Sequence, residues 1–360
     1  MNIADNIKGC ITWCDGKIHI LYHALITART RNGKDCTLTA ETKKQLDDFW
    51  GHYRQMIPWY IRKYMYRHCA FYINKTGLFS EIYIPDNLYY TLIDTFYNNH
   101  KFADYLDNKC LYDVLLAGVK QPVSVAKRMN QIWYVDNIPT TEEHVKKILS
   151  SRSEFVLKIA TYSSGGHGVY FLHGDETDKL ASIISNVKND IIIQEPLRQH
   201  SALSVLNPSS VNTIRLISLL RNNEVKVYSC IIRMGIDGSR VDNASSGGIT
   251  CGINKDGRLN EFAFSAKGKK YLVHPSTSRH FNDTVVPSFK KCQEIVKKVH
   301  LTLPWFRLIS WDFAIDECGD PVLIETNLRY GELDFHQLNN GPLFGVDTAD
   351  ILNEVLSKTK

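Results

Sequence analysis

Several features are missing from this chain of 360 residues, and each absence narrows what the protein can be. The chain has nine cysteines, an odd number, and they are scattered along the sequence. No Cys-x-x-Cys pair occurs. Cys10 and Cys14 are four residues apart, but no second pair completes a zinc site. We therefore expect buried, reduced thiols rather than a disulfide framework, and with them a reducing compartment.

Long apolar runs and concentrated charge are also missing. The chain has no stretch of 18 apolar residues, so we expect no transmembrane helix. Met1–Asp5 is not a basic region followed by a long apolar run, so we expect no secretory signal. We expect a soluble, cytoplasmic protein without stable membrane insertion. The net charge of +5 is small and dispersed, which argues against a nucleic-acid partner. It is compatible with phosphates or acidic sugars.

The composition that is present is that of a folded protein of about two domains, with 44% hydrophobic and 22% charged residues. The first third predicts helices at 39–53, after Pro58, at 88–96 and at 109–117. Strands then alternate with helices: strands at 123–126, 155–159 and 191–195, helices at 141–149 and 287–299, and an antiparallel pair at 213–220 and 225–234. The pattern predicts the α+β class, with a mainly helical region 1–105 and a second region 106–360.

The most informative segment predicts a hairpin of strands 310–316 and 322–327, with a turn at 317–320. Side chains alternate along a strand, so Glu325 and Asn327 share a face, and the hairpin can bring Asp312 opposite them. Three oxygen donors on apolar strands suit Mg²⁺, which usually shares its ligands with substrate phosphates. The alternative is a surface hairpin with incidental polar residues.

A second segment joins a strand that ends in Lys158 to a loop rich in serine and glycine. Glycine lets backbone N–H groups approach a polyphosphate, and the lysine adds positive charge beside it. The lysine precedes the loop, so this is neither a Walker P-loop nor a dinucleotide fingerprint. A flexible hairpin loop is the alternative. The candidate phosphate contacts in the loop are Ser163, Ser164, Gly165, Gly166, His167 and Gly168.

A third segment is the apolar strand at 191–195, which ends in Gln194-Glu195-Pro196-Leu197. Gln194, Glu195 and the backbone of the segment could bind an adenine edge, with Leu197 packing on the ring. A buried strand that simply ends in a turn is the alternative.

Along the chain, the glycine-rich loop with Lys158 comes first, the hinge strand second, and Asp312 with Glu325 and Asn327 last. In that order, the three segments resemble those of the ATP-grasp superfamily over about residues 105–345. The resemblance implies an ATP-grasp fold at 106–360, with the glycine-rich loop in 106–197 and the metal and acceptor part in 198–360. It implies ATP and two Mg²⁺ ions as cofactors. Lys109 and Lys158 would then hold phosphates, Glu195 and Leu197 would form the hinge, and Asp312, Glu325 and Asn327 would bind the metal.

A finer resemblance is to sugar-transfer-associated ATP-grasp proteins of bacterial polysaccharide biosynthesis. It rests on 210–215, 233–235, 241–243, 247–249, 274–275 and 337–345. It implies a carboxylate–amine ligase that acts through an acylphosphate on a saccharide or small-molecule carboxylate and an amine, and that could dock to other enzymes of that pathway. A sugar phosphotransferase and a non-catalytic nucleotide-binding assembly protein remain as alternatives.

The chain departs from the ligase pattern at two positions. Many ATP-grasp ligases have an arginine two residues before the metal aspartate, ready to stabilise an oxyanion, and here that residue is Ser310. Arg215 and Arg233, on the predicted central strands, are the candidates to replace it, with Asn243 as a neutral donor. No acidic residue follows the hinge to bind ribose, so that contact stays open.

Overall fold

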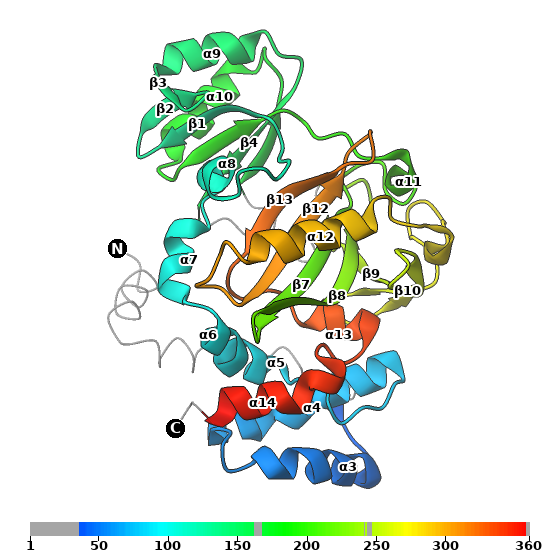
Figure 1. Cartoon of the computed structure of the whole chain (residues 1–360). Coiled ribbons are helices and arrows are strands. Elements are labelled where there is room, and N and C mark those ends of the chain that lie inside the picture. Colours follow the sequence, from blue (N-terminus) through cyan, green and yellow to red (C-terminus); the bar gives the residue numbers. More distant parts are fainter. Residues whose placement is uncertain (1–35, 162–167, 241, 243–246, 358–360) are drawn as a thin grey trace.

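The computed structural model describes residues 36–161, 168–240, 242 and 247–357 (Figure 1). Two antiparallel sheets, one of six and one of seven strands, are accompanied by helices. This confirms the α+β class, and helices precede the strands as the sequence predicts. Within the described ranges, no helix is both long and apolar enough to cross a membrane.

The smaller sheet has the strand order β3-β2-β1-β6-β4-β5. One of its faces buries Leu157 and Ile193 against helices α9 and α10. Strand alternation turns Lys158 and Val156 to the opposite face, where both line a cleft. Its elements are β1 (Ser124–Met129), β2 (Ile132–Val135), β3 (Ile138–Thr140), α9 (Glu142–Ser150), β4 (Phe155–Ile159), β5 (Val169–Leu172), α10 (Thr177–Asn186) and β6 (Ile191–Gln194).

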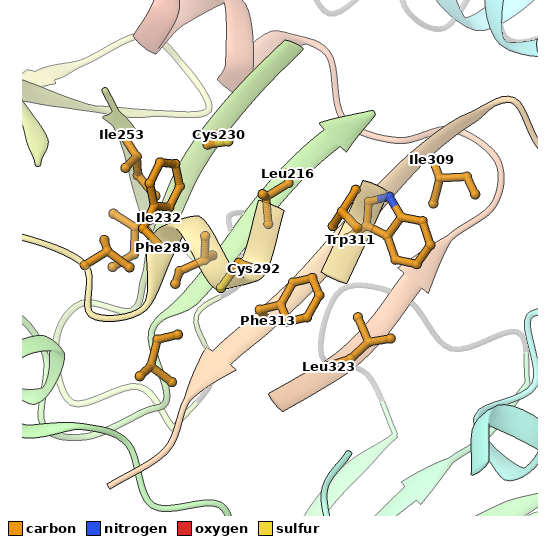
Figure 2. Close-up of a cluster of buried hydrophobic side chains, with 14 of the residues drawn as sticks. Leu216, Cys230, Ile232, Ile253, Phe289, Cys292, Ile309, Trp311, Phe313 and Leu323 are labelled. Atoms are coloured by element: carbon orange, nitrogen blue, oxygen red, sulfur yellow. The ribbon is translucent and has the colours of Figure 1, made fainter. Parts of the chain in front are cut away.

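The larger sheet has the order β11-β10-β9-β8-β7-β12-β13. Helix α12 covers one face, where Leu216, Ile232 and Trp311 pack with Cys292 (Figure 2). The elements are α11 (Ser201–Ser204), β7 (Thr213–Arg221), β8 (Glu224–Met234), β9 (Ile249–Ile253), β10 (Leu259–Ser265), β11 (Lys270–Tyr271), η6 (Phe281–Asp283), α12 (Phe289–His300), β12 (Leu308–Ile315), β13 (Pro321–Asn327), α13 (Asp334–Asn340), η7 (Gly345–Asp347) and α14 (Thr348–Ser357).

The N-terminal helices pack on the other face of this larger sheet. Their core is shared with Ile217 and Leu219 of β7, Leu308 of β12 and Leu352 of α14, so the two ends of the chain form one hydrophobic cluster. The elements of this layer are α3 (Ala40–Trp50), η2 (Gly51–Tyr53), α4 (Trp59–Thr76), α5 (Asp86–Leu88), the π-helix η3 (Tyr89–Ile93) and α6 (Asp94–Tyr97). The chain continues through α7 (His100–Leu106), η4 (Lys109–Leu111) and α8 (Tyr112–Leu115), and Ala103 and Tyr112 of these elements join the core on the α12 side instead.

Local signals in the sequence place several elements correctly. The Thr39 hydroxyl accepts a hydrogen bond from the Thr42 N–H and caps α3. The turn between β7 and β8 has positive φ at Asn222 and Asn223, a conformation that asparagine tolerates. The helix expected at 109–117 is shorter: a 3₁₀ turn precedes the four-residue α8, and Gly118 follows with φ of 86°.

The shared core predicts that the two ends of the chain unfold together. Leu352→Ala should lower the free energy of unfolding by about 2–5 kcal/mol, because its side chain is fully buried between the ends. Val346→Ala is the control, since Val346 is 93% exposed, and should change it by less than about 0.5 kcal/mol. Urea titration followed by circular dichroism measures both. Separate transitions for the helices and the larger sheet would contradict the shared core.

Candidate active site

A cleft of about 1370 Å³ lies between the two sheets and collects most of the charged residues that the sequence singles out. The smaller sheet lines it with Lys158, Val156 and Phe171, and the larger sheet with Arg215, Arg233 and Asp312. The segment between the sheets adds residues from 195–213. The remaining charged residues of its lining are Asp107, Lys109, Arg152, Glu154, Glu195, Arg198, Arg240, Asp242, Glu325, Arg329 and Glu332.

The predicted hairpin is present as β12 and β13, and it brings the three candidate ligands together. Asp312 lies opposite Glu325, and Ser310 lies opposite Asn327. A bulge follows Asp312, where the register shifts. The Asn327 Nδ2 lies 3.3 Å from the Asp312 Oδ2, to which it donates a hydrogen bond. The hairpin therefore presents its oxygen donors to the cleft.

Arg215 holds Asp312 with two parallel hydrogen bonds. Its Nε donates to Oδ1 at 2.7 Å and one terminal nitrogen to Oδ2 at 2.6 Å, while the other terminal nitrogen binds Glu332. Arg233 approaches the same Oδ2 at 3.5 Å. Burial opposes charge on Asp312, but the two guanidinium groups outweigh it and hold the pKa of Asp312 below its usual value.

The two candidate phosphate lysines differ in their partners. Lys109 Nζ donates to Glu325 Oε1 at 2.7 Å, and although burial lowers the pKa of Lys109, Glu325 and Asp107 raise it overall. Lys158 has no ion pair among the described residues. Burial and the neighbouring Lys109 lower the pKa of Lys158 to about 8. Lys158 is thus a poorly compensated cation, which an anionic ligand would stabilise.

The donor set fits Mg²⁺, because carboxylate and amide oxygens are the ligands this hard cation prefers. The described residues contain no group of three His, Cys, Asp or Glu side chains arranged for a metal. A site here therefore needs the amide oxygen of Asn327 beside Asp312 and Glu325. The Asp312 Oδ2 accepts from Arg215, Asn327 and Arg233, whereas Oδ1, which accepts from the Arg215 Nε, keeps a second lone pair for a metal.

The hinge residues do not all face the cleft. Glu195 and Leu197 line it, whereas Gln194 lines a separate cavity of about 180 Å³ behind α8. The Glu195 N–H is bound by the Val123 carbonyl, and its carboxylate accepts a hydrogen bond from Arg152 at 2.8 Å. An adenine ring would therefore have to use the backbone nearer Leu197.

Part of the glycine-rich loop and one candidate catalytic residue lie outside the described residues. These are Ser163, Ser164, Gly165, Gly166, His167 and Asn243. Gly168 is described, with φ of 79°, and a Cβ there would fall 2.7 Å from the Ile159 Cδ1. A glycine is therefore required where the loop returns to β5.

The loop after β13 contributes residues that the sequence reasoning did not assign. Glu332 binds Arg215, and Tyr330 lines the cleft with φ of 54°. A Cβ on Gly331 would fall 2.2 Å from the Ser310 Oγ. Ser310 is buried under this loop, so the position has no room for an arginine side chain. The signal in the sequence was Glu332, a carboxylate five residues after the candidate ligand Asn327.

Comparison with known proteins places the chain in a family. A family profile described as sugar-transfer associated ATP-grasp matches residues 90–349, well over half of the chain. The chain belongs to this ATP-grasp family. The resemblance inferred from the sequence is thereby confirmed, together with the ATP-grasp fold. No curated protein matches the chain.

Solved structures of other ATP-grasp enzymes are similar only distantly. The ligase PsnB, solved in complex with a minimal precursor, is 13% identical to this chain. The match covers 72% of this chain and 64% of the PsnB chain, with a TM-score of 0.42. The D-alanine–D-alanine ligase from Coxiella burnetii is 12% identical, with coverage of 72% and 59% and a TM-score of 0.42. The VanG D-Ala:D-Ser ligase from Enterococcus faecalis is 16% identical, with coverage of 71% and 62% and a TM-score of 0.41. The chain thus spans less than two thirds of these proteins.

The depressed pKa of Lys158 predicts a pH-dependent cost in stability. Below about pH 8 the folded state carries this partly buried charge, and the cost disappears as pH rises toward the usual lysine value of 10.5. Lys158→Met should raise the free energy of unfolding at pH 7 by about 1–3 kcal/mol, and by less at pH 10. Lys127→Met is the control, because Lys127 is paired with Asp113 at 2.5 Å and its loss should destabilise at both pH values. A gain for Lys158→Met that does not depend on pH would contradict the assignment.

The contact between Gly331 and Ser310 predicts a coupled pair of substitutions. Gly331→Ala should lower the free energy of unfolding by about 1–3 kcal/mol, because the new methyl group meets the Ser310 hydroxyl. Adding Ser310→Ala should recover part of that loss, which a double-mutant cycle in urea measures. Gly51→Ala is the control, since a Cβ there meets nothing within 4 Å. Additive losses in the cycle would rule out the steric contact.

Proposed function

We propose that the protein is an ATP-dependent ligase that joins a carboxylate to an amine through an acylphosphate. The observation that carries this proposal is the meeting of Lys109, Lys158, Arg215, Asp312 and Glu325 in one cleft between two sheets. The family match supports the use of ATP. The nature of the bond formed is the proposed step.

The charges of the cleft suggest how ATP would lie. Lys158 lacks a counter-ion among the described residues and would pair with phosphate oxygens, joined by Lys109 once it leaves Glu325. Leu197 and the aliphatic side chain of Val156 would pack on adenine. Two Mg²⁺ ions held by Asp312, Glu325 and Asn327 would neutralise phosphate charge. We propose that residues 106–360 form this ATP-grasp unit.

The chemistry would need two transfers. A carboxylate oxygen of the substrate attacks the γ-phosphorus, ADP leaves, and an acylphosphate forms. The amine then attacks the acyl carbon, the resulting oxyanion collapses, and phosphate leaves as the amide forms. Arg215 and Arg233 are the cations placed to stabilise that oxyanion. Arg215 lies opposite Asp312 on the neighbouring strand. From there it could take the role of the arginine that many ATP-grasp ligases have at the position of Ser310.

We propose a sugar carboxylate, such as a uronic acid, and an amino acid or simple amine as substrates. The support is the sugar-transfer association in the family description, together with the four arginines that line the cleft besides Arg215 and Arg233. A cytoplasmic setting agrees with the cysteines: those in the described residues are all free thiols. Docking to other polysaccharide enzymes belongs to the same proposal.

The direct test is product analysis. The protein is incubated with ATP, Mg²⁺ and pairs of uronic acids and amino acids, and the products are weighed by mass spectrometry. A ligase gives a mass equal to the two substrates less one water, with release of ADP and phosphate. A sugar whose mass grows by one phosphate would identify the alternative phosphotransferase. Nucleotide binding without turnover for every pair would favour the assembly protein.

The metal ligands predict a graded loss of activity. Asp312→Asn should lower turnover by about a hundredfold or more, since the amide weakens both the metal site and the pair with Arg215. Asp316→Asn is the matched control on the same hairpin, because Asp316 lies in the turn and pairs with Lys120 outside the cleft. ADP release with the best substrate pair measures both. Full activity of Asp312→Asn would sink the assignment of this carboxylate.

A further inference from the structure

The loop after the last metal ligand is held at both of its ends by the N-terminal helices. The Tyr330 N–H donates to Asp94 Oδ2 at 3.2 Å, and the Leu333 N–H donates to the Tyr90 hydroxyl at 3.1 Å. Between these two points lies Glu332, which binds Arg215. The helices thus reach the cleft through the backbone of one short loop, here called the clamp loop (Tyr330–Leu333).

The two residues that bind the clamp loop belong to the π-helix and the residue after it: Tyr90 lies within η3, and Asp94 begins α6. Tyr90 and Asp94 are four residues apart, so they project from one side of the helix. Short π-helices occur often at functional sites, where they re-aim side chains. Here Tyr90 and Asp94 are spaced so that they bind two N–H groups of the clamp loop, those of Leu333 and Tyr330.

Asp94 is itself fixed by several partners. It is 1% exposed, accepts a hydrogen bond from Asn98 at 3.0 Å, and binds His100 Nε2 at 2.6 Å. The His100 ring lies edge-on to the Tyr330 ring with 4.8 Å between centroids. Asn98 also pairs with the backbone of Leu308 at the start of β12. Asp94 is thus tied to the metal-ligand strand as well as to the clamp loop.

The clamp loop pays a conformational cost that these contacts offset. Tyr330 has φ of 54°, which is uncommon for a residue with a side chain. Gly331 lies against the buried Ser310. A loop with such restraints keeps the Glu332 carboxylate in one place, and Glu332 with Asp312 fixes the two sides of the Arg215 guanidinium.

We propose that Asp94 and Tyr90 are positioning residues for Arg215 and the metal-ligand hairpin. They act through the clamp loop and Glu332, which gives the N-terminal helices a role in the active site. The catalytic purpose of this positioning rests on the proposed function. The attachment of the loop to the helices stands independently of it.

The first test measures the loop in the protein without ligand. Hydrogen–deuterium exchange, read by mass spectrometry over peptides covering 328–335, is compared for the wild type, Asp94→Asn and Tyr90→Phe. Tyr90→Phe removes the acceptor of the Leu333 N–H. Asp94→Asn leaves one oxygen for the donors that share the two carboxylate oxygens of Asp94, namely the Tyr330 N–H, Asn98 and His100. Exchange in that peptide should therefore accelerate at least about tenfold in each variant. Thr91→Val is the matched control, because the Thr91 hydroxyl bonds only Asn87 within the same helix. Unchanged exchange in both variants would overturn the inference.

The second test measures positioning through nucleotide binding. Calorimetry compares AMP-PNP binding with Mg²⁺ and with EDTA. Asp94→Asn should weaken binding with Mg²⁺ by about 10–100-fold and leave binding in EDTA unchanged, which a general loss of stability would not do. Glu332→Gln should cause the same selective loss, and the double variant should add little to either.

The outcomes separate this inference from the proposed function. Full additivity of Asp94→Asn and Glu332→Gln, or equal loss with Mg²⁺ and EDTA, would overturn the positioning role. If the wild type binds no nucleotide under either condition, the proposed function fails, and the exchange measurement alone decides the inference.

Discussion

The buried pair between Arg215 and Asp312 is the interaction on which the site depends. Both side chains are about 5% exposed or less, so each charge would be costly without the other. The pair joins β7 to β12, which are neighbouring strands near the β13 edge of the larger sheet, and the two residues lie opposite one another. Glu332 completes it from a loop, and Arg233 adds a second cation from β8. The same geometry fixes a candidate metal ligand and a candidate catalytic cation.

One face of the larger sheet forms a hydrophobic core, and the other face carries the charged residues of the cleft. Leu216 and Trp311 turn to α12 and form an apolar core, while Arg215 and Asp312 turn to the other face by strand alternation. That second face is apolar at Ile217 and Leu219, where the helices from both chain ends cover it. It becomes charged where it meets the cleft. The helices therefore support the face on which the polar site stands.

Among the described residues, most charges in the cleft are paired with an opposite charge, but that of Lys158 is not. Asp312 and Glu325 have cationic partners, whereas Lys158 carries a charge that burial and Lys109 disfavour. Such an arrangement costs stability in the free protein and favours an anionic ligand, as binding sites often do. The Gly331–Ser310 contact is a second constraint, since it excludes a large side chain beside Asp312 and makes the neighbouring strand the source of the cation.

The sequence alone determined the local elements and the order of the motifs. The Thr39 hydroxyl gave the cap, and the tolerance of Asn222 and Asn223 for positive φ gave the turn. The shared face of Glu325 and Asn327 followed from the two-residue period of a strand, and the hairpin brought Asp312 opposite them. Only the tertiary structure decided what lies across from these residues. Gln194 lies behind α8, Glu332 reaches Arg215, and Asp94 holds the clamp loop across 236 positions of sequence. Periodicity and turn chemistry act between neighbours in the chain, whereas these contacts depend on how the sheets and helices pack.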